Sequence, residues 1–335
     1  MKKIIYSISV VALALSAGLP AQAQDSVTSF YKGKTITIIT PFPPGGSYDR
    51  YSRMAARYMG KYIPGHPAII VKNKSGVAGT MRDFAENSVD DGTAMGIFPE
   101  TIAIEQKTNP SMAPWDVGKL VYIGSFSDAN TGFYLRKGAP AKGVEDFRKV
   151  QTNIGCNSPI GQSCVYPKLL KKYLGYKFNV IAGYKGQAPM RLALRRGEID
   201  LTSGNWAGWR NRAGIKDGTF KVVIQGGLTR LKDLANVPLM QDLVTDPTEK
   251  KIIEFWSSGA PIGRALVLRK SVPKDRIDAL RAAFDKMVKD PDLLKDAAKT
   301  KTPIEPKSGV EVQRISDGIL NTPKKLLDLA EQAIQ

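Results

Sequence analysis

Three short turns rich in glycine, serine and asparagine each lie between a predicted strand and a predicted helix. They span residues 45–49 (GGSYD), 73–79 (NKSGVAG) and 157–163 (NSPIGQS). The first backbone amides of a helix have no partner within the helix, and together with the helix dipole they bind carboxylate or phosphate groups. Glycine keeps this backbone open because it carries no side chain. Each turn alone is also typical of a tight turn without function, but three together predict an anion-binding site.

The residues that catalysis would need do not occur in the usual patterns. The only histidine, His66, lies in a Pro-Gly-His-Pro turn that does not suit a general base for a serine nucleophile, and no Gly-x-Ser-x-Gly elbow occurs. Gly33-Lys34-Thr35 precedes its strand, whereas a phosphate-binding loop follows one. We therefore expect no enzyme activity, no catalytic residue and no cofactor, and a secreted hydrolase is a distant alternative.

The two cysteines, Cys156 and Cys164, stand eight positions apart at the third turn. In an oxidising compartment such a pair is expected to form a disulfide, which for a short loop stabilises by on the order of 2–3 kcal/mol. Two buried thiols are the alternative. Because the chain has one histidine and no Cys-x-x-Cys pattern, we expect no metal site.

The N-terminus indicates export. Lys2 and Lys3 precede a short apolar run and an Ala-Gln-Ala site that ends at Ala23. This order is typical of a secretory signal peptide, residues 1–23. A membrane anchor is the alternative, but the apolar run is shorter than the ~20 residues that a span needs. We therefore expect the mature protein in the periplasm.

The chain carries a large surplus of basic residues, which alone does not establish an anionic partner. The formal net charge is +18, and removal of the two lysines of the signal peptide leaves +16. A basic surplus indicates nucleic acid, a membrane surface or an anionic ligand. Export and the dispersal of the basic residues along the chain argue against nucleic acid. A small anion agrees best with the three glycine-rich turns.

Apolar runs and helical patterns alternate along the mature chain, as they do in parallel α/β folds. Residues 35–40 (TITIIT) form the first predicted strand, and the helix after it has Tyr51, Met54 and Ala55 on one face. Further strands are predicted at 68–71, 93–98, 153–155, 178–184, 222–225 and 265–268, and further helices at 163–174, 188–196 and 273–288. A chain of this length and pattern favours two lobes over a single core.

Several stretches of the sequence, in this order, resemble one protein family. They are 36–49 (ITIITPFPPGGSYD), 71–79 (VKNKSGVAG), 91–93 (DGT), 184–186 (YKG), 197–200 (GEID), 279–284 and 290–291. Over nearly the whole mature chain, the sequence resembles the extracytoplasmic solute-binding receptors of tripartite tricarboxylate transporters, which are also known as the Bug or TctC-like family.

The resemblance implies an α/β fold, the two-lobe periplasmic-binding-protein fold of type II, with a ligand cleft between the lobes. Lobe 1 is expected to span residues 24–126 plus about 232–335, and lobe 2 about 127–231. A monomer would capture a small organic anion, either a carboxylate in general or an aromatic dicarboxylate, and deliver it to membrane transporter subunits. A receptor that presents its ligand to a two-component sensor kinase is the alternative.

By position, the resemblance assigns the ligand contacts to three loops and to the lobe crossing. The assigned residues are Phe42, Gly45, Gly46, Ser47 and Asp49 in the first loop, Gly76, Val77 and Ala78 in the second, Gly161, Gln162 and Ser163 in the third, and Thr131 at the crossing. The third loop departs from the family pattern because it carries two cysteines and no histidine, and residues 205–209 (NWAGW) depart as well. The identity of the ligand therefore stays open.

Three residues outside the loops have roles that the sequence leaves open. Trp206 or Trp209 would stack on a planar ligand if it lay near the cleft, or would fill the core of the lobe. Arg264 is either an additional anion contact or one half of a salt bridge.

Overall fold

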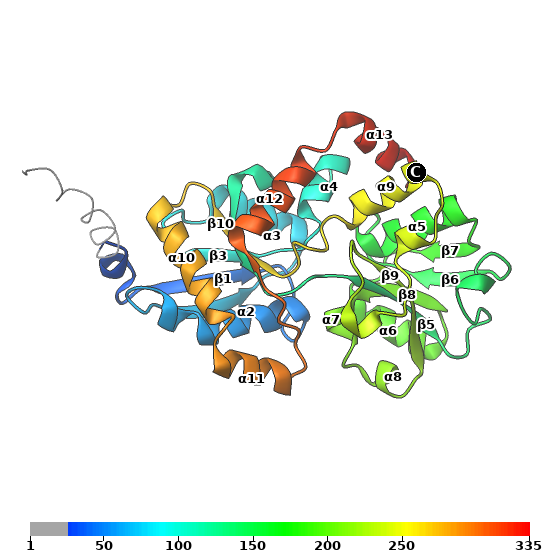
Figure 1. Ribbon diagram of the computed structural model, residues 1–335, viewed down its shortest axis with the longest axis horizontal. Helices are drawn as coiled ribbons and strands as arrows, with labels where there is room; N and C mark the ends of the chain where they lie inside the picture. Colours follow the sequence, from blue (N-terminus) through cyan, green and yellow to red (C-terminus); the bar gives the residue numbers. More distant parts are fainter. Residues whose placement is uncertain (1–25) are drawn as a thin grey trace, which may run out of the picture.

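The computed structural model describes residues 26–335, and the signal peptide expected at residues 1–23 lies outside them. Two β-sheets, each covered by helices, lie side by side, the first on the left of Figure 1 and the second on the right. This arrangement is the two-lobe α/β architecture expected from the sequence. No helix within residues 26–335 is long and apolar enough to cross a membrane.

The first sheet has six strands in the order β11-β4-β10-β3-β1-β2. Strand β1 pairs in parallel with β2 and β3, whereas β10 runs antiparallel to β3 and β4. The strands are β1 (Thr35–Thr40), β2 (Ala68–Asn73), β3 (Ala94–Ile97), β4 (Leu120–Ser125), β10 (Ala265–Arg269) and β11 (Lys307–Ser308). Because β1 and β2 are parallel and adjacent, the first and second glycine-rich loops begin at the same edge of this sheet.

The second sheet has five strands in the order β7-β6-β8-β5-β9. Strand β6 is parallel to β7 and β8, and β5 is antiparallel to β8 and β9. The strands are β5 (Thr131–Arg136), β6 (Thr152–Gly155), β7 (Phe178–Ile181), β8 (Leu201–Asn205) and β9 (Phe220–Gly226). The third glycine-rich loop follows β6, at the edge where β5 begins.

The helices lie between the strands along the chain and after the last strand. They are α2 (Ser47–Tyr58), α3 (Val77–Asn87), α4 (Ile102–Thr108), α5 (Gln162–Leu174), α6 (Gln187–Arg196), α7 (Trp206–Trp209), α8 (Ala213–Lys216), α9 (Pro247–Ser257), α10 (Lys274–Met287), α11 (Pro291–Lys299), α12 (Gly309–Leu320) and α13 (Lys324–Gln332). In α2 the buried face contains Tyr51, Met54 and Ala55, and in α10 it contains Leu280 and Phe284. Both faces confirm the helical periodicity read from the sequence.

The chain passes from the first sheet to the second at residues 126–130, and residues 258–264, which precede β10 of the first sheet, run beside this segment. The two segments, which we call the hinge, are joined by backbone hydrogen bonds. The amide of Phe126 donates to the carbonyl of Arg264 (3.1 Å), and the amide of Arg264 donates to the carbonyl of Ser127 (3.1 Å). The hinge is therefore a short two-stranded ribbon between the sheets.

The lobe boundaries expected near residues 127 and 232 remain predictions. The packing of α9 indicates that the chain returns to the first lobe after residue 232. The hydroxyl of Tyr166 in α5 donates to the carbonyl of Trp256 in α9 (3.3 Å), so α9 packs on a helix of the second lobe. We therefore propose that the return crossing is the hinge segment that follows α9.

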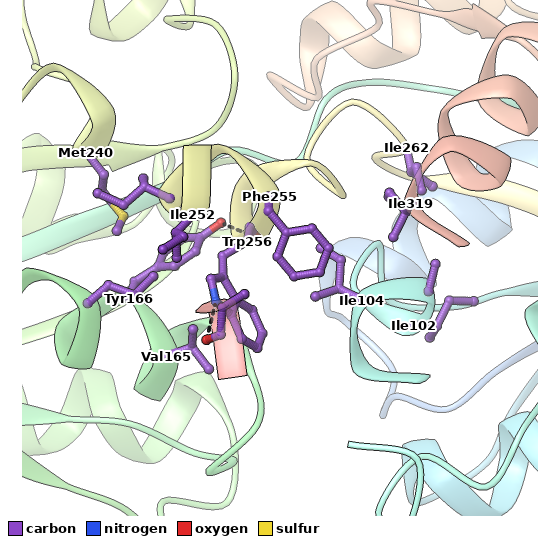
Figure 2. Packing of buried hydrophobic residues seen from close by; sticks show 14 of the residues in the cluster. Ile102, Ile104, Val165, Tyr166, Met240, Ile252, Phe255, Trp256, Ile262 and Ile319 are labelled. Carbon is purple, nitrogen blue, oxygen red and sulfur yellow. Dashed lines mark hydrogen bonds between the residues drawn. The ribbon is translucent and has the colours of Figure 1, made fainter. Parts of the chain in front are cut away.

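A hydrophobic seam joins the lobes beside the hinge. Figure 2 shows Ile102 and Ile104 of α4 in the same buried cluster as Phe255 and Trp256 of α9. The indole nitrogen of Trp256 also donates to the carbonyl of Ala330 in the C-terminal helix α13 (3.3 Å). Helix α13 follows α12 of the first lobe, so its packing on α9 ties the C-terminus to the second lobe.

Candidate functional site

The first glycine-rich loop is braced by Asp49. Its Oδ2 accepts from the amide of Gly45 (2.9 Å) and from Nε of Arg53 (3.0 Å), and its Oδ1 accepts from Nδ2 of Asn73 (3.0 Å). Burial acts to raise the pKa of Asp49, but these hydrogen bonds hold it below its ordinary value. The carboxylate therefore stays ionised, and its oxygens accept hydrogen bonds from Gly45, Arg53 and Asn73. The ligand contact that the resemblance implies for Asp49 remains a prediction.

Asn73 joins the first loop to the second. Besides its bond to Asp49, its Nδ2 donates to the carbonyl of Phe42 (2.9 Å). Asn73 is the last residue of β2, and the second loop turns from there through Gly76, whose φ of +87° suits glycine. The predicted residues of both loops thus form one connected edge of the first sheet. Asn73 was not assigned to the site from the sequence, because its partners are distant in the chain.

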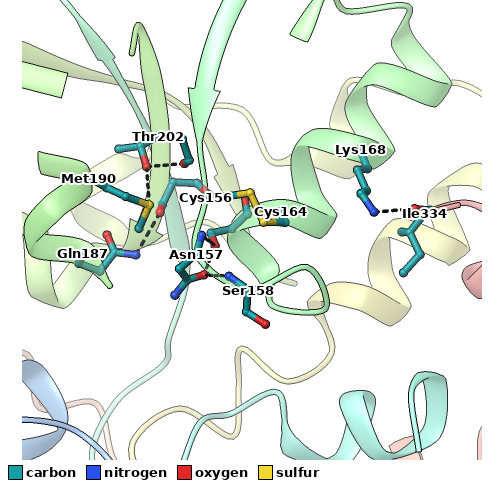
Figure 3. Close-up of a disulfide and its surroundings, with 12 residues drawn as sticks. Cys156, Asn157, Ser158, Cys164, Lys168, Gln187, Met190, Thr202 and Ile334 are labelled. Carbon is teal, nitrogen blue, oxygen red and sulfur yellow. Dashed lines mark hydrogen bonds between the residues drawn. A yellow bond between two sulfur atoms is a disulfide. The ribbon is translucent and has the colours of Figure 1, made fainter. Parts of the chain in front are cut away.

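The third loop is closed by the predicted disulfide. Cys156 and Cys164 are bonded, which confirms the pairing and excludes two free thiols. Within the loop, the amide of Asn157 donates to Oγ of Ser163 (3.2 Å), and that hydroxyl donates to Oδ1 of Asn157. In Figure 3 the disulfide and Asn157 lie where β6 passes into α5, with segments of the first lobe below them. The disulfide therefore fixes the start of α5.

The helices that follow these loops begin without a capping side chain. Gly46, Gly76 and Gly161 are the N-cap residues of α2, α3 and α5, and in the part of the chain that the structure describes none of these three helices has a side-chain cap. Asp246, Asp290 and Ser308 cap α9, α11 and α12 with their side chains, whereas α4, α6, α7, α8, α10 and α13 also begin without a capping side chain. Amides in the first turns of α2, α3 and α5 are consequently left for water or for a ligand.

Helix α6 also begins at an uncapped glycine, Gly186, with a φ of +99°. It follows β7 in the second sheet. Its third residue is Pro189, which has no amide hydrogen, so it offers fewer donors than the helices that follow the three loops.

Polar atoms without partners gather near Thr131 at the start of β5. The hydroxyl of Thr131 donates to Oε1 of Gln162 (3.1 Å), and Thr131 lies opposite Asn205 in the sheet. Within residues 26–335, Nε2 of Gln162 and Oδ1 of Asn205 are buried and have no hydrogen-bond partner. A buried donor or acceptor without a partner costs about 1–3 kcal/mol, so both atoms favour a bound polar group. Asn205 was missed from the sequence as a candidate.

Arg264 lies behind the first loop and is paired. Its Nη1 lies 2.6 Å from Oε2 of Glu100, and both side chains are buried. Nη1 also donates to the hydroxyl of Tyr48 (3.1 Å), and the guanidinium lies over the Tyr48 ring, 4.1 Å from its centre. Of the two roles left open for Arg264, the structure shows the salt bridge. Contact with an anion remains a prediction; within residues 26–335, Nε of Arg264 is buried and has no hydrogen-bond partner.

The two tryptophans lie in different surroundings. Trp209 is buried in the core of the second lobe, where its ring stacks on Tyr134 at 3.8 Å. Trp206 lines a pocket of about 40 Å³ beside the hinge, with Ser127, Arg210 and Pro303 among the other lining residues. Pockets that hold small organic ligands have about 300–1,000 Å³, so this pocket admits such a ligand only if the lobes move apart.

The predicted site residues therefore fall into four places. Phe42, Gly45, Gly46, Ser47, Asp49, Gly76, Val77 and Ala78 lie along one edge of the first sheet, Gly161, Gln162, Ser163 and Thr131 lie at the end of the second sheet, Trp206 lies beside the hinge, and Arg264 lies behind the first loop. Their contact with a ligand remains a prediction.

Glu105 in α4 titrates near neutral pH. Burial raises its pKa to about 7, the neighbouring charge of Glu100 adds to this, and a hydrogen bond from Oγ1 of Thr101 (2.7 Å) opposes it. The ordinary value is 4.5. A raised carboxyl pKa contributes stability that is present below pH 4.5 and is lost as the pH rises through 7.

We expect Glu105→Gln to flatten the dependence of the melting temperature on pH between pH 5 and pH 8. The neutral amide has no charge to bury, so the variant should exceed the wild type in stability at pH 8 by at most about 3 kcal/mol and match it near pH 4. Glu86→Gln, on an exposed face of α3, is the matched control. An unchanged pH dependence in Glu105→Gln would show that Glu105 is not the titrating group.

We expect the double variant Cys156→Ala/Cys164→Ala to lose about 2–3 kcal/mol of stability. The start of α5 would no longer be tethered to the end of β6, so binding through the third loop should weaken as well. Thermal melting with and without reductant tests this, because reductant should lower the melting temperature of the wild type and leave that of the variant unchanged. Equal sensitivity of both proteins would contradict the prediction.

No protein-family model matches the sequence, and no curated protein matches it. Solved structures do match over nearly the whole chain. A TctC solute binding protein from Polaromonas has 20% identity and a TM-score of 0.65, covering 91% of this chain and 99% of its own. The periplasmic binding protein BugD has 18% identity and a TM-score of 0.69, covering 90% and 98%. MatC from Rhodopseudomonas palustris, with bound malate, has 17% identity and a TM-score of 0.64, covering 90% and 99%.

These likenesses confirm the predicted fold. The chain has the two-lobe α/β fold of TctC and Bug periplasmic binding proteins.

Proposed function

We propose that this protein is a periplasmic solute-binding protein that holds a small carboxylate between its lobes. The observation that carries the proposal is the set of uncapped helix starts at Gly46, Gly76 and Gly161, which lie on both sheets. Helix N-termini bind carboxylates through free amides and the helix dipole. MatC, which has the same fold, is a malate-bound protein, and this agrees with a carboxylate ligand.

In this proposal, one carboxylate group of the ligand accepts hydrogen bonds from amides at the starts of α2 and α3. Hydrogen bonds to an ionised acceptor are short and about twice as strong as neutral ones, so no free cation is required. Ordered water can bridge the remaining distance. Nε2 of Gln162 and Oδ1 of Asn205 then form hydrogen bonds to the part of the ligand that faces the second lobe.

Closure of the lobes would complete the site. A ligand shifts the balance between open and closed forms only by contacts that one form makes and the other lacks. Contacts to both lobes exist only when the lobes approach, and the two-stranded hinge permits that approach. The closed form would then be recognised by the membrane subunits of a tripartite tricarboxylate-type transporter, to which the protein delivers its ligand from the periplasm.

A thermal-shift screen of the purified mature protein tests this function. The panel contains malate and other aliphatic mono-, di- and tricarboxylates together with aromatic ones, and the hits are measured by calorimetry. A ligand at 100 times its Kd should stabilise the protein by about 2.7 kcal/mol. If the folded protein is stabilised by no carboxylate in the panel, the proposed function is wrong.

A further inference from the structure

We infer that Arg264 is a positioning residue: from the hinge, its side chain holds Tyr48 and thereby fixes the first glycine-rich loop. The consequence for ligand affinity rests on the proposed function, whereas the effect on the loop does not. The inference starts from the position of Arg264 in the chain. It ends the returning segment of the hinge, and its amide and carbonyl both bond to the outgoing segment. Its side chain therefore links the backbone of the hinge to whatever it contacts.

The contacts of the guanidinium lead to the first loop. Tyr48 belongs to the first turn of α2, two residues after the N-cap Gly46. The Arg264 guanidinium lies over the Tyr48 ring and bonds its hydroxyl, and the Tyr48 ring stacks on Phe42 at 4.3 Å with 18° between the planes. Phe42 and Tyr48 lie on either side of Gly45 and Gly46 in the chain. The stacking of their rings therefore holds the two ends of the first glycine-rich loop together.

Glu100 completes the arrangement as the shared acceptor. Its Oε2 accepts from Arg264 (2.6 Å) and from the hydroxyl of Tyr48 (2.5 Å). Burial raises the pKa of Tyr48 well above its ordinary value, so the hydroxyl keeps the proton that it donates. A tyrosine held by a charged acceptor, a cation over its ring and an aromatic neighbour has little freedom to change rotamer.

The same contacts argue against Arg264 as a direct anion contact. Its charge is balanced by Glu100, its side chain is 2% exposed, and the Tyr48 ring covers it. Its Nη1 is bonded to Glu100 and Tyr48, and its Nε, a buried donor without a partner among residues 26–335, is shielded from solvent as long as the Tyr48 ring stays in place. Arg264 consequently acts on a ligand only through the loop that it holds in place.

The test is hydrogen exchange of the ligand-free protein, comparing the wild type with Glu100→Met/Arg264→Met. Replacing both members of a buried ion pair by apolar residues often preserves stability, so the fold should persist. The amides of Gly45 and Arg50 report on the first loop, because they bond to Asp49 Oδ2 and to the carbonyl of Gly46. We expect their exchange to rise at least about tenfold, with exchange in the third loop unchanged.

Two results would overturn the inference. Equal exchange of Gly45 and Arg50 in both proteins would mean that the loop does not depend on the ion pair. An equal rise in the first and third loops would mean that the substitutions only destabilise the protein. If the double variant fails to fold, Arg264→Lys replaces it, because lysine keeps the charge beside Glu100 but lacks the planar group that covers Tyr48.

Ligand affinity separates positioning from direct contact. For a carboxylate identified by the screen, the double variant should bind at least about tenfold more weakly, with the same dependence of log Kd on salt as the wild type, because no charge facing the ligand has been removed. Weaker binding with a reduced salt dependence would place Arg264 on the ligand and overturn the inference. If the wild type binds no carboxylate, the proposed function fails, and the exchange measurement still decides whether Arg264 holds the loop.

Discussion

Replacement of Gly46 by valine is expected to weaken carboxylate binding by about 100-fold or more, equivalent to 2.7 kcal/mol, which is the loss of one or two hydrogen bonds to a charged group. Gly46 is the N-cap of α2, and its φ of −80° and ψ of 177° suit any residue. A Cβ there would meet only the carbonyl of Pro43, at 3.8 Å. A side chain at this position therefore has room for its Cβ, and we expect the valine methyl groups to occupy the space in front of the free amides.

Calorimetry with the carboxylate found by the screen, together with thermal melting, measures this effect. Gly143→Val is the matched control, because Gly143 is extended, has open space where its Cβ would be, and follows β5 at the end away from the hinge. The control should bind like the wild type, and both variants should melt like it. Affinity near that of the wild type in Gly46→Val would count against the first loop as part of the site.

The elements that were predicted from the sequence follow from local patterns, whereas α4, α7, α8, α9, α11, α12 and α13 were not predicted. The β-branched run of β1, the apolar face of α2 and the disulfide all depend on residues within a few positions of each other. Helix α6 ends as predicted at Gly197, whose φ of +78° is left-handed. In each case the physical cause lies within one turn or one strand, so the sequence displays it directly.

The contacts that organise the candidate site join residues far apart in the chain. Asp49 is bonded to Asn73, which stands 24 positions away, and this contact with the second loop was not predicted from the sequence. Arg264 lies 164 positions from Glu100, so its salt bridge was one of two open readings. Spacing along the chain carries no signal for such pairs, because they depend on which strands become neighbours in the sheet.

Glu100→Met is expected to destabilise the protein by about 3–5 kcal/mol, the usual cost of leaving one charge of a buried pair without its partner. Arg264 cannot lose its proton, so the variant must keep an uncompensated guanidinium with 2% of its side chain exposed. Urea unfolding at pH 8 measures the loss. Stability close to that of the wild type would show that water or another group already compensates Arg264.

The reverse substitution, Arg264→Met, should differ from Glu100→Met in its dependence on pH. The Glu100 carboxylate left behind is buried without its cation, and burial without a cation disfavours the charged form of a carboxyl group. Stability from a carboxyl with a raised pKa is present below the unfolded pKa and is lost as the pH rises. Arg264→Met should therefore regain stability relative to the wild type between pH 8 and pH 5, whereas Glu100→Met should not. Parallel pH profiles for the two variants would mean that Glu100 and Arg264 are not each other's main partners. If they are main partners, the double variant Glu100→Met/Arg264→Met should be more stable than either single variant.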